Sequence, residues 1–189
     1  GEATHEVALD GRRFCLRTYN GMVPAPTIRV AASTEPRHIR VDLDNTFGLS
    51  EWRYIAGKEG ATDPHCNDFN LTNLHFHGGH VRPDFSAPPD DDDVCSGEGC
   101  GPDGRYYADN VLVHVGPGES KQYRWDIDED QIHHEGTDWY HPHIHGTTAI
   151  QVSNGSAGAI IIEGPVDHIP EIERARERVM VLNQIPIDS

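Results

Sequence analysis

The sequence predicts an all-β protein built as an antiparallel β-sandwich with Greek-key connections. Apolar and polar residues alternate over several short stretches, which is the pattern of strands with one buried and one wet face. Glycine and proline, with 19 and 13 residues, supply turns between these stretches. Helical periodicity is almost absent, and the one internal duplication is a His-x-His motif. Many short strands joined by turns are typical of sandwich folds.

The first half of the chain begins with a predicted β-hairpin. Apolar positions on both sides of Asp10-Gly11, a turn-forming pair, indicate two strands that fold back on each other. Residues 27–30 form a short predicted strand. Residues 37–45 alternate cleanly, with Ile39 and Leu43 on the face expected to be buried. Residues 46–68 are irregular and are expected to form a long loop.

The second half alternates strands with loops. We expect strands at 69–78, 111–115, 123–127, 136–145 and 159–162, and a helical turn at 147–152. Residues 165–178 are polar and suggest a linker, with one helical turn around 171–177. Residues 179–182 are apolar and predict a final strand with nothing after it to pack against. We therefore expect one domain over 1–164, and a linker and first strand over 165–189 that lead to a following domain.

Composition excludes several classes of function. The 189 residues carry a formal net charge of −16, which disfavours nucleic acid and anionic membranes as partners because both reward clustered Lys and Arg. No apolar run reaches the ~18–20 residues of a membrane-spanning helix. The polar first residues show no signal peptide, although a cleaved secretory signal leaves the same trace.

The segment 82–107 is predicted to be an inserted surface loop that covers the histidine side of the molecule or reaches a neighbouring domain. It is rich in Asp, Gly and Pro and has few apolar anchors. Cys95 and Cys100 bracket its glycine-rich part and could close a small disulfide, which would fit an oxidising compartment. The sequence leaves open whether Cys15 and Cys66 also pair. The aspartates at 90–93 lack the spacing of a calcium loop and indicate a solvated acidic surface.

Two His-x-His motifs carry the chemistry, with His75 and His77 in the first and His141 and His143 in the second. On a β-strand, side chains two residues apart point to the same face, so neighbouring strands would bring four imidazoles together. Imidazole suits copper, zinc, iron or nickel, and copper binds most tightly in that series. Histidine ligands without a carboxylate favour copper over non-haem iron. We expect two or three metal ions that share ligands between the strands.

Other histidines are expected to play lesser parts. His80 and His145 are interpreted as structural or as supports for the ligands. His133 and His134 lie in an acidic loop and are interpreted as exposed residues or a surface metal trap. The pair at 65–66, a His beside a Cys, lacks further ligands at a useful spacing. Trp139 and Tyr140 are expected to orient the neighbouring histidines.

The two motif segments, 73–78 and 136–146, resemble the amino-terminal copper motifs of multicopper oxidases, the family of laccases and bacterial copper-resistance oxidases. The resemblance extends to residues 20–30 and 156–164, and the His-Pro-His form resembles bacterial members. It implies a cupredoxin domain at 1–164 of a secreted or periplasmic protein from which the signal peptide has been removed. It further implies that His75 binds a type 2 copper, that His77 and His141 share one type 3 copper, and that His143 binds the other.

In that family a trinuclear copper cluster reduces O₂ to water, and a type 1 copper receives electrons from a small reducing substrate such as a phenol or a metal ion. A type 1 site needs a His-Cys-His motif, and this sequence has none. The resemblance therefore implies that further cupredoxin domains, in the same precursor or another chain, supply the remaining ligands, and that this chain alone is inactive.

Two other functions remain open at this point. The chain could be a stand-alone module that binds or sequesters copper without oxidase activity. It could also belong to an oligomeric oxidase whose ligands meet across an interface between chains.

Overall fold

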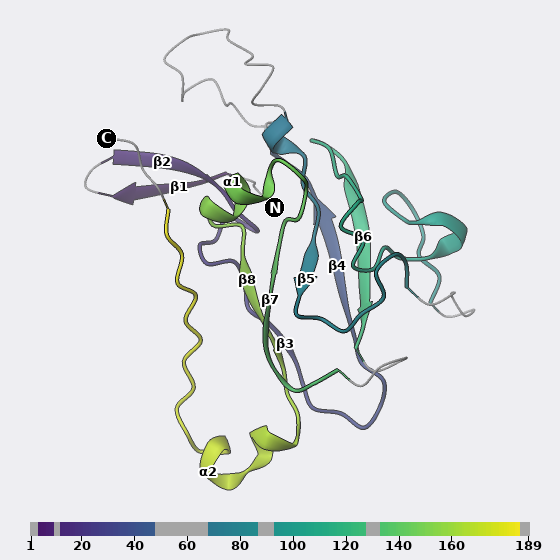
Figure 1. Cartoon of the computed structure of the whole chain (residues 1–189), viewed down its shortest axis with the longest axis vertical. Coiled ribbons are helices and arrows are strands. Elements are labelled where there is room, and N and C mark those ends of the chain that lie inside the picture. The colour runs from purple at the N-terminus through teal and green to yellow at the C-terminus, as the bar shows by residue number, and fades with distance from the viewer. Residues whose placement is uncertain (1–3, 10–11, 48–67, 87–92, 128–132, 186–189) are drawn as a thin grey trace, which may run out of the picture.

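The fold was analysed in a computed structural model, which describes residues 4–9, 12–47, 68–86, 93–127 and 133–185. The architecture is all-β, as predicted, with only short helices (Figure 1). A four-stranded sheet has the order β3-β8-β7-β5, and strands β4 and β6 pair separately. The predicted amino-terminal hairpin is confirmed as β1 (Thr4–Leu9) paired antiparallel with β2 (Arg12–Arg17).

The four-stranded sheet contains β3 (Ile28–Val30), β5 (His75–His77), β7 (Gly136–His141) and β8 (Gly158–Ile162). Strand β8 is buried over its whole length, which explains its continuous apolar sequence. Strands β5, β7 and β8 pair antiparallel, but β3 pairs parallel with β8. The expectation of a wholly antiparallel sandwich is therefore wrong for this one pair.

The second layer is formed by β4 (His38–Asp44) and β6 (Ser120–Asp126), which pair antiparallel over seven residues each. The alternation predicted for residues 37–45 is confirmed, since Ile39 and Leu43 are buried and the residues between them are less so. Both layers contribute to one core. Its fully buried large side chains include Trp125 and Tyr123 from β6, Phe76 from β5 and Ile160 from β8.

Three predicted strands are shorter or absent. The strand expected at 69–78 begins only at His75, because residues 68–70 form a 3₁₀ turn and Thr72 makes an isolated bridge with Val115. The strand expected at 136–145 ends at His141, because Pro142 has no backbone N–H for the ladder. The strand expected at 111–115 is replaced by a turn, in which the Asn110 side chain accepts a hydrogen bond from the N–H of Leu112.

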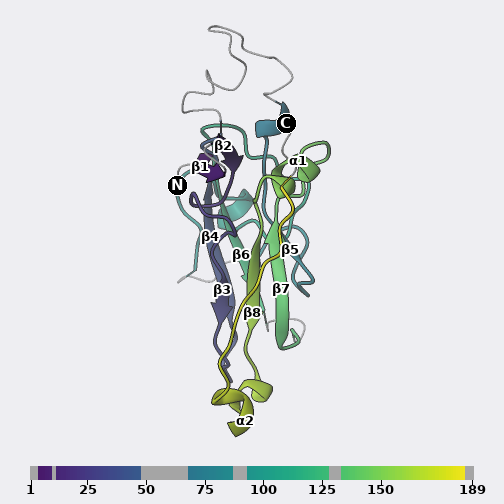
Figure 2. The same ribbon diagram turned by 90° about the vertical axis from the view of Figure 1, so that its left-hand side faces the viewer.

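The end of the described chain is helical and then extended. The predicted helical turn at 147–152 is confirmed as α1 (Thr148–Ser153). A 3₁₀ turn (Pro165–His168) and the short helix α2 (Pro170–Glu173) follow β8, so the turn expected around 171–177 begins and ends earlier. The chain then runs back alongside the four-stranded sheet in both views (Figures 1 and 2). Residues 179–182 have no strand pairing within the described chain, and Met180 and Leu182 are exposed.

Residues 93–107 of the insert pack on the edge of β6. Cys95 and Cys100 form the expected disulfide. The Gln122 side chain donates hydrogen bonds to the carbonyl groups of Ser96 and Glu98, at 3.1 and 3.2 Å. Asp93 forms ion pairs with Arg40 and Arg124. Cys66 lies outside the described residues, as do residues 90–92 of the acidic run, so the pairing of Cys15 and Cys66 stays open.

Candidate metal centre

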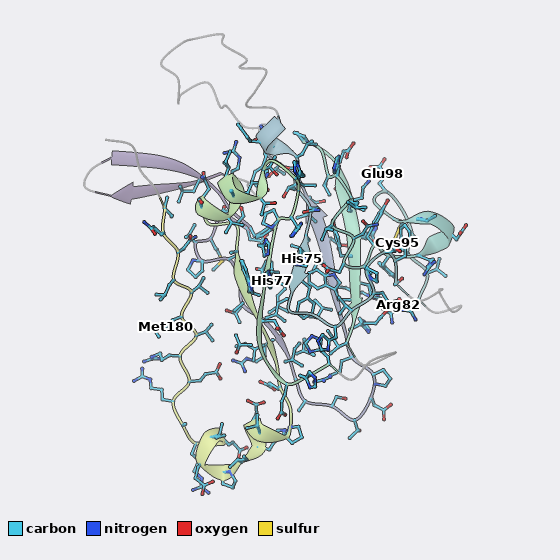
Figure 3. All side chains as sticks on the ribbon, viewed as in Figure 1. His75, His77, Arg82, Cys95, Glu98 and Met180 are labelled. Atoms are coloured by element: carbon cyan, nitrogen blue, oxygen red, sulfur yellow. A yellow bond between two sulfur atoms is a disulfide. The ribbon has the colours of Figure 1, made fainter. Side chains whose placement is uncertain are left out.

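The two His-x-His motifs lie on neighbouring antiparallel strands, as the sequence predicted. In the register of β5 and β7, His75 is opposite His141, Phe76 is opposite Tyr140, and His77 is opposite Trp139. Phe76 and Tyr140 point into the core. Because side chains alternate along a strand, His75, His77 and His141 share the other face of the sheet. Figure 3 shows His75 and His77 together on this strand.

Three of the four predicted ligands form a compact group. One side-chain nitrogen from each of His75, His77 and His141 lies within 4.8 Å of the other two, and no other set among the described residues meets this criterion. His143 stands beside the group, with its ring centre 4.8 Å from that of His75. It is exposed and lies beyond the end of β7. The structure thus gathers all four imidazoles, with His143 at the rim.

His75 is held by a carboxylate that the sequence analysis did not single out. The Nδ1 atom of His75 lies 2.9 Å from Oδ2 of Asp109, and the backbone N–H of Phe76 donates a hydrogen bond to Oδ1 at 2.8 Å. A carboxylate only accepts, so the His75 proton is on Nδ1 and the lone pair is on Nε2. A carboxylate behind a histidine fixes the ring and raises its basicity toward a metal.

His141 has its donor nitrogen fixed by the backbone. Its Nδ1–H donates to the carbonyl group of Pro142 at 2.7 Å, which leaves a lone pair on Nε2. That Nε2 atom lies 3.2 Å from Nδ1 of His77, so the two nitrogens point at the same small volume. Burial lowers the pKa of His141 to about 4, against an ordinary value of 6.5, and the neighbouring histidines contribute in the same direction. His141 is therefore neutral at pH 7, the form that binds metal.

Asn73 joins the two motifs beyond the end of β7. It is fully buried. Its side-chain oxygen accepts a hydrogen bond from the backbone N–H of His143 at 2.6 Å, and its amide donates to the carbonyl group of Val111 at 2.9 Å. Because Pro142 ends the ladder, this side-chain contact takes over the positioning of His143. The sequence placed Asn73 in the motif but gave no sign of this role.

Aromatic side chains support the ligands, as expected. Trp139 stacks on His141 with ring centres 4.1 Å apart and an angle of 26°, and on His77 at 4.8 Å and 28°. Tyr140 points to the opposite side, where its hydroxyl group donates to the carbonyl group of Pro26 at 2.6 Å. One residue therefore covers two ligand rings, and its neighbour fixes the strand to the core.

The other histidines are distributed as follows. His145 is exposed in the turn after β7. His80 and His134 are exposed, but His133 is buried, so the expectation of an exposed loop residue is wrong for His133. Residues 65–66 lie outside the described residues. Within the described part of the insert, Cys95 and Glu98 lie well to the right of His75 and His77 in Figure 3, away from these two histidines.

Comparison with known proteins gives a family match for part of the chain. A family model described as "Multicopper oxidase" matches residues 101–167, which include β6, the second His-x-His motif and β8. The match covers just over a third of the 189 residues, so this part of the chain is similar to multicopper oxidases. The resemblance drawn from the motifs is thereby confirmed, and so is the cupredoxin-like sandwich. Copper is the metal that this family implies for the histidine group.

Two solved structures illustrate the similarity. The domain is 28% identical to a multicopper oxidase from Campylobacter jejuni described as a metallo-oxidase, with a TM-score of 0.51, over 86% of this chain and 24% of that one. It shares its fold with a blue copper oxidase from Nitrosomonas europaea, at 20% identity and a TM-score of 0.52, over 93% and 40%. No curated protein matched in a sequence search.

This chain therefore spans about a quarter of the Campylobacter protein and two fifths of the Nitrosomonas protein. Within the described residues, no helix has the length and apolar character needed to cross a membrane.

Proposed function

We propose that this chain is the amino-terminal domain of a multicopper oxidase and supplies half of the histidine ligands of a trinuclear copper cluster. The observation that carries the proposal is the group of three ligand nitrogens on β5 and β7, within 4.8 Å of one another, in a chain of which part is similar to multicopper oxidases. The remaining ligands would come from further cupredoxin domains, in the same precursor or in another chain.

The residues fit copper. His75 and His141 each have one ring nitrogen hydrogen-bonded to an acceptor, so the other nitrogen presents a lone pair. We assign His75 to a type 2 copper, His77 and His141 to a shared type 3 copper, and His143 to the second type 3 copper. The 3.2 Å between the facing nitrogens of His77 and His141 supports a shared ion, because both nitrogens are directed at one position.

The chain's own residues prepare this site without the metal. Asp109 holds the proton of His75 on Nδ1, the Pro142 carbonyl group does the same for His141, and Asn73 holds the backbone of His143. Burial keeps His141 unprotonated, as its lowered pKa shows. Metal binding therefore has a small entropic cost, because few side chains remain to be ordered.

Copper held by these histidines would supply the electron transfer for reduction of O₂ to water, and a phenol or a metal ion would be oxidised elsewhere in the complete enzyme. A metal ion is a reasonable substrate class, since the similar Campylobacter protein is described as a metallo-oxidase. The site of substrate oxidation would lie outside this chain, which has no His-Cys-His motif. We place the protein in the periplasm or outside the cell, and the Cys95–Cys100 disulfide supports an oxidising compartment.

The test is a copper titration of this chain, followed by absorption, EPR and oxygen consumption. We expect copper to bind without the intense thiolate band at about 600 nm that marks a type 1 site, and without oxidase turnover. The variant His141→Ala/His143→Ala should lose most specific copper uptake, whereas His114→Ala, an exposed loop histidine, should keep it. Unchanged uptake in the double variant would refute the ligand assignment. A strong blue band from this chain alone would refute its role as a partial site.

A further inference from the structure

A second group of histidines is formed by His80, which follows β5, and by His133 and His134, which precede β7. At its centre is His133, of which only 5% is exposed. Its ring stacks on Phe76, with centres 5.4 Å apart and an angle of 22°. A buried histidine in an acidic loop needs a partner for both ring nitrogens.

Only one nitrogen of His133 has such a partner among the described residues. Nδ1 donates to the carbonyl group of His134 at 2.8 Å, so the neutral ring has its lone pair on Nε2. Nε2 is buried and has no hydrogen bond within the described chain. The carboxylate group of Asp138 is 3.9 Å from this atom, beyond hydrogen-bond range. A lone pair and a carboxylate oxygen that face each other are both electron-rich, and a cation between them would satisfy both.

Two more imidazoles stand at the open side of this pair. The ring of His80 lies 5.6 Å from that of His133 and 5.4 Å from that of His134, measured between ring centres. Three imidazoles and one carboxylate are a donor set for a borderline first-row divalent ion such as Zn²⁺ or Cu²⁺. A proton alone would not explain the gathering of two further histidines at this position.

We propose that His80, His133, His134 and Asp138 form a second binding site for a divalent transition-metal ion. His133 and Asp138 form its fixed, buried side. His80 and His134 are both exposed, and they close the site by rotating toward the buried pair, because their ligand atoms do not yet converge on one point.

This second site is separate from the candidate copper ligands. Asp138 alternates with Trp139 along β7 and so points to the face opposite Trp139, and His133 packs on Phe76, whose ring points away from the face of His75 and His77. An ion at the second site would therefore lie on the other side of the sheet. The proposal does not depend on the proposed oxidase function.

The test counts zinc bound to the whole chain after dialysis, by mass spectrometry of the metal and by calorimetric titration. All variants are made in the background of His141→Ala/His143→Ala, here called the parent, because these changes weaken competing metal binding at the candidate copper site. We expect His80→Gln/His134→Gln in this parent to lose one bound Zn²⁺ per chain, or to bind it at least about tenfold more weakly. His114→Gln is the matched control and should behave as the parent. Thermal melting checks that each variant is folded.

The variants at positions 80 and 134 should fold, because both residues are exposed. The variants His133→Gln and Asp138→Asn then test whether the buried side of the site contributes to zinc binding. A shift of the His133 ring nitrogen resonance on addition of Zn²⁺ would identify the ligand directly. Equal zinc stoichiometry and affinity in the parent and in the His80/His134 variant would overturn the proposal. Failure of the copper assignment would instead appear as unchanged copper uptake in His141→Ala/His143→Ala.

Discussion

The carboxylate group of Asp109 lies 2.9 Å from Nδ1 of His75, although 34 positions of sequence, including the whole insert, separate the two residues. The same carboxylate accepts the backbone N–H of Phe76. Asp109 thus fixes both the ring of one candidate ligand and the strand that carries two of the candidates.

Replacing Asp109 should weaken copper binding more than it weakens the fold. Asp109→Asn keeps the shape but loses the charge behind His75, and we expect copper affinity to fall about 10–100-fold. Asp109→Ala should also lower the free energy of unfolding, because the N–H of Phe76 loses its acceptor. Competition with a copper chelator and urea unfolding measure the two effects. The control is Asp84→Asn, because Asp84 is exposed and its carbonyl group accepts a hydrogen bond from the N–H of Ala108. Equal copper affinities of Asp109→Asn and Asp84→Asn would contradict a role for Asp109.

Trp139 should act through its stacking on His77 and His141 rather than through any bond to metal. Trp139→Ala removes both stacks, and we expect weaker copper binding and a broader spread of EPR parameters, because the two rings are less well ordered. Trp139→Phe should restore most of the affinity. Each aromatic pair contributes about 0.5–1.5 kcal/mol, so stability should change little in the phenylalanine variant. The prediction fails if alanine and phenylalanine have the same effect.

The low pKa of His141 predicts a pH dependence of the metal-free chain. The folded-state pKa is about 4, against an ordinary value of 6.5. Between these values the unfolded chain binds a proton at His141 and the folded chain does not, so the free energy of unfolding falls as the pH drops from 6.5 toward 4. Urea unfolding at several pH values, with chelator present, measures the slope. His141→Gln should show a shallower slope, and an identical slope would exclude His141 as a source.

The disulfide should stabilise the insert without affecting the ligands. Cys95 and Cys100 are five positions apart, and closing so short a loop contributes about 2 kcal/mol at most. Cys95→Ser/Cys100→Ser should therefore lower the free energy of unfolding by up to that amount. Copper uptake should be unchanged, because the disulfide lies away from His75 and His77 (Figure 3). A loss of copper uptake in folded protein would show that the insert reaches the ligands.

Local sequence patterns predicted which segments form buried strands, but not the residues at which the strands end. The alternation at β4 and the apolar run at β8 identified both correctly, because burial directly selects those residues. The strand containing the second motif was predicted four residues too long, since alternation continued past Pro142, where the ladder ends. Likewise, Val115 looked like part of a strand but pairs only with Thr72.

The sequence predicted that the four histidines lie close together, but it did not predict the residues that hold them in place. Four histidines at two-residue spacing are a local signal, and the structure brings them together. Asp109 and Asn73 are placed by contacts with residues far along the chain, and neither lies at a spacing that indicates a role. The burial of His133 was missed for the same reason, because its contact with Phe76 joins two distant segments.

Strand β5 is only three residues long, and its middle residue belongs to the core while its outer two belong to the metal group. Core and ligands are thus interleaved in sequence yet separated in space by the plane of the sheet. Because His75 and His77 face away from the core, we expect substitutions at these positions to leave the packing around Phe76 largely intact. The domain is therefore a good starting point for redesign. Carboxylates or thiols could replace the imidazoles on one side of the sheet, while the core on the other side is left unchanged.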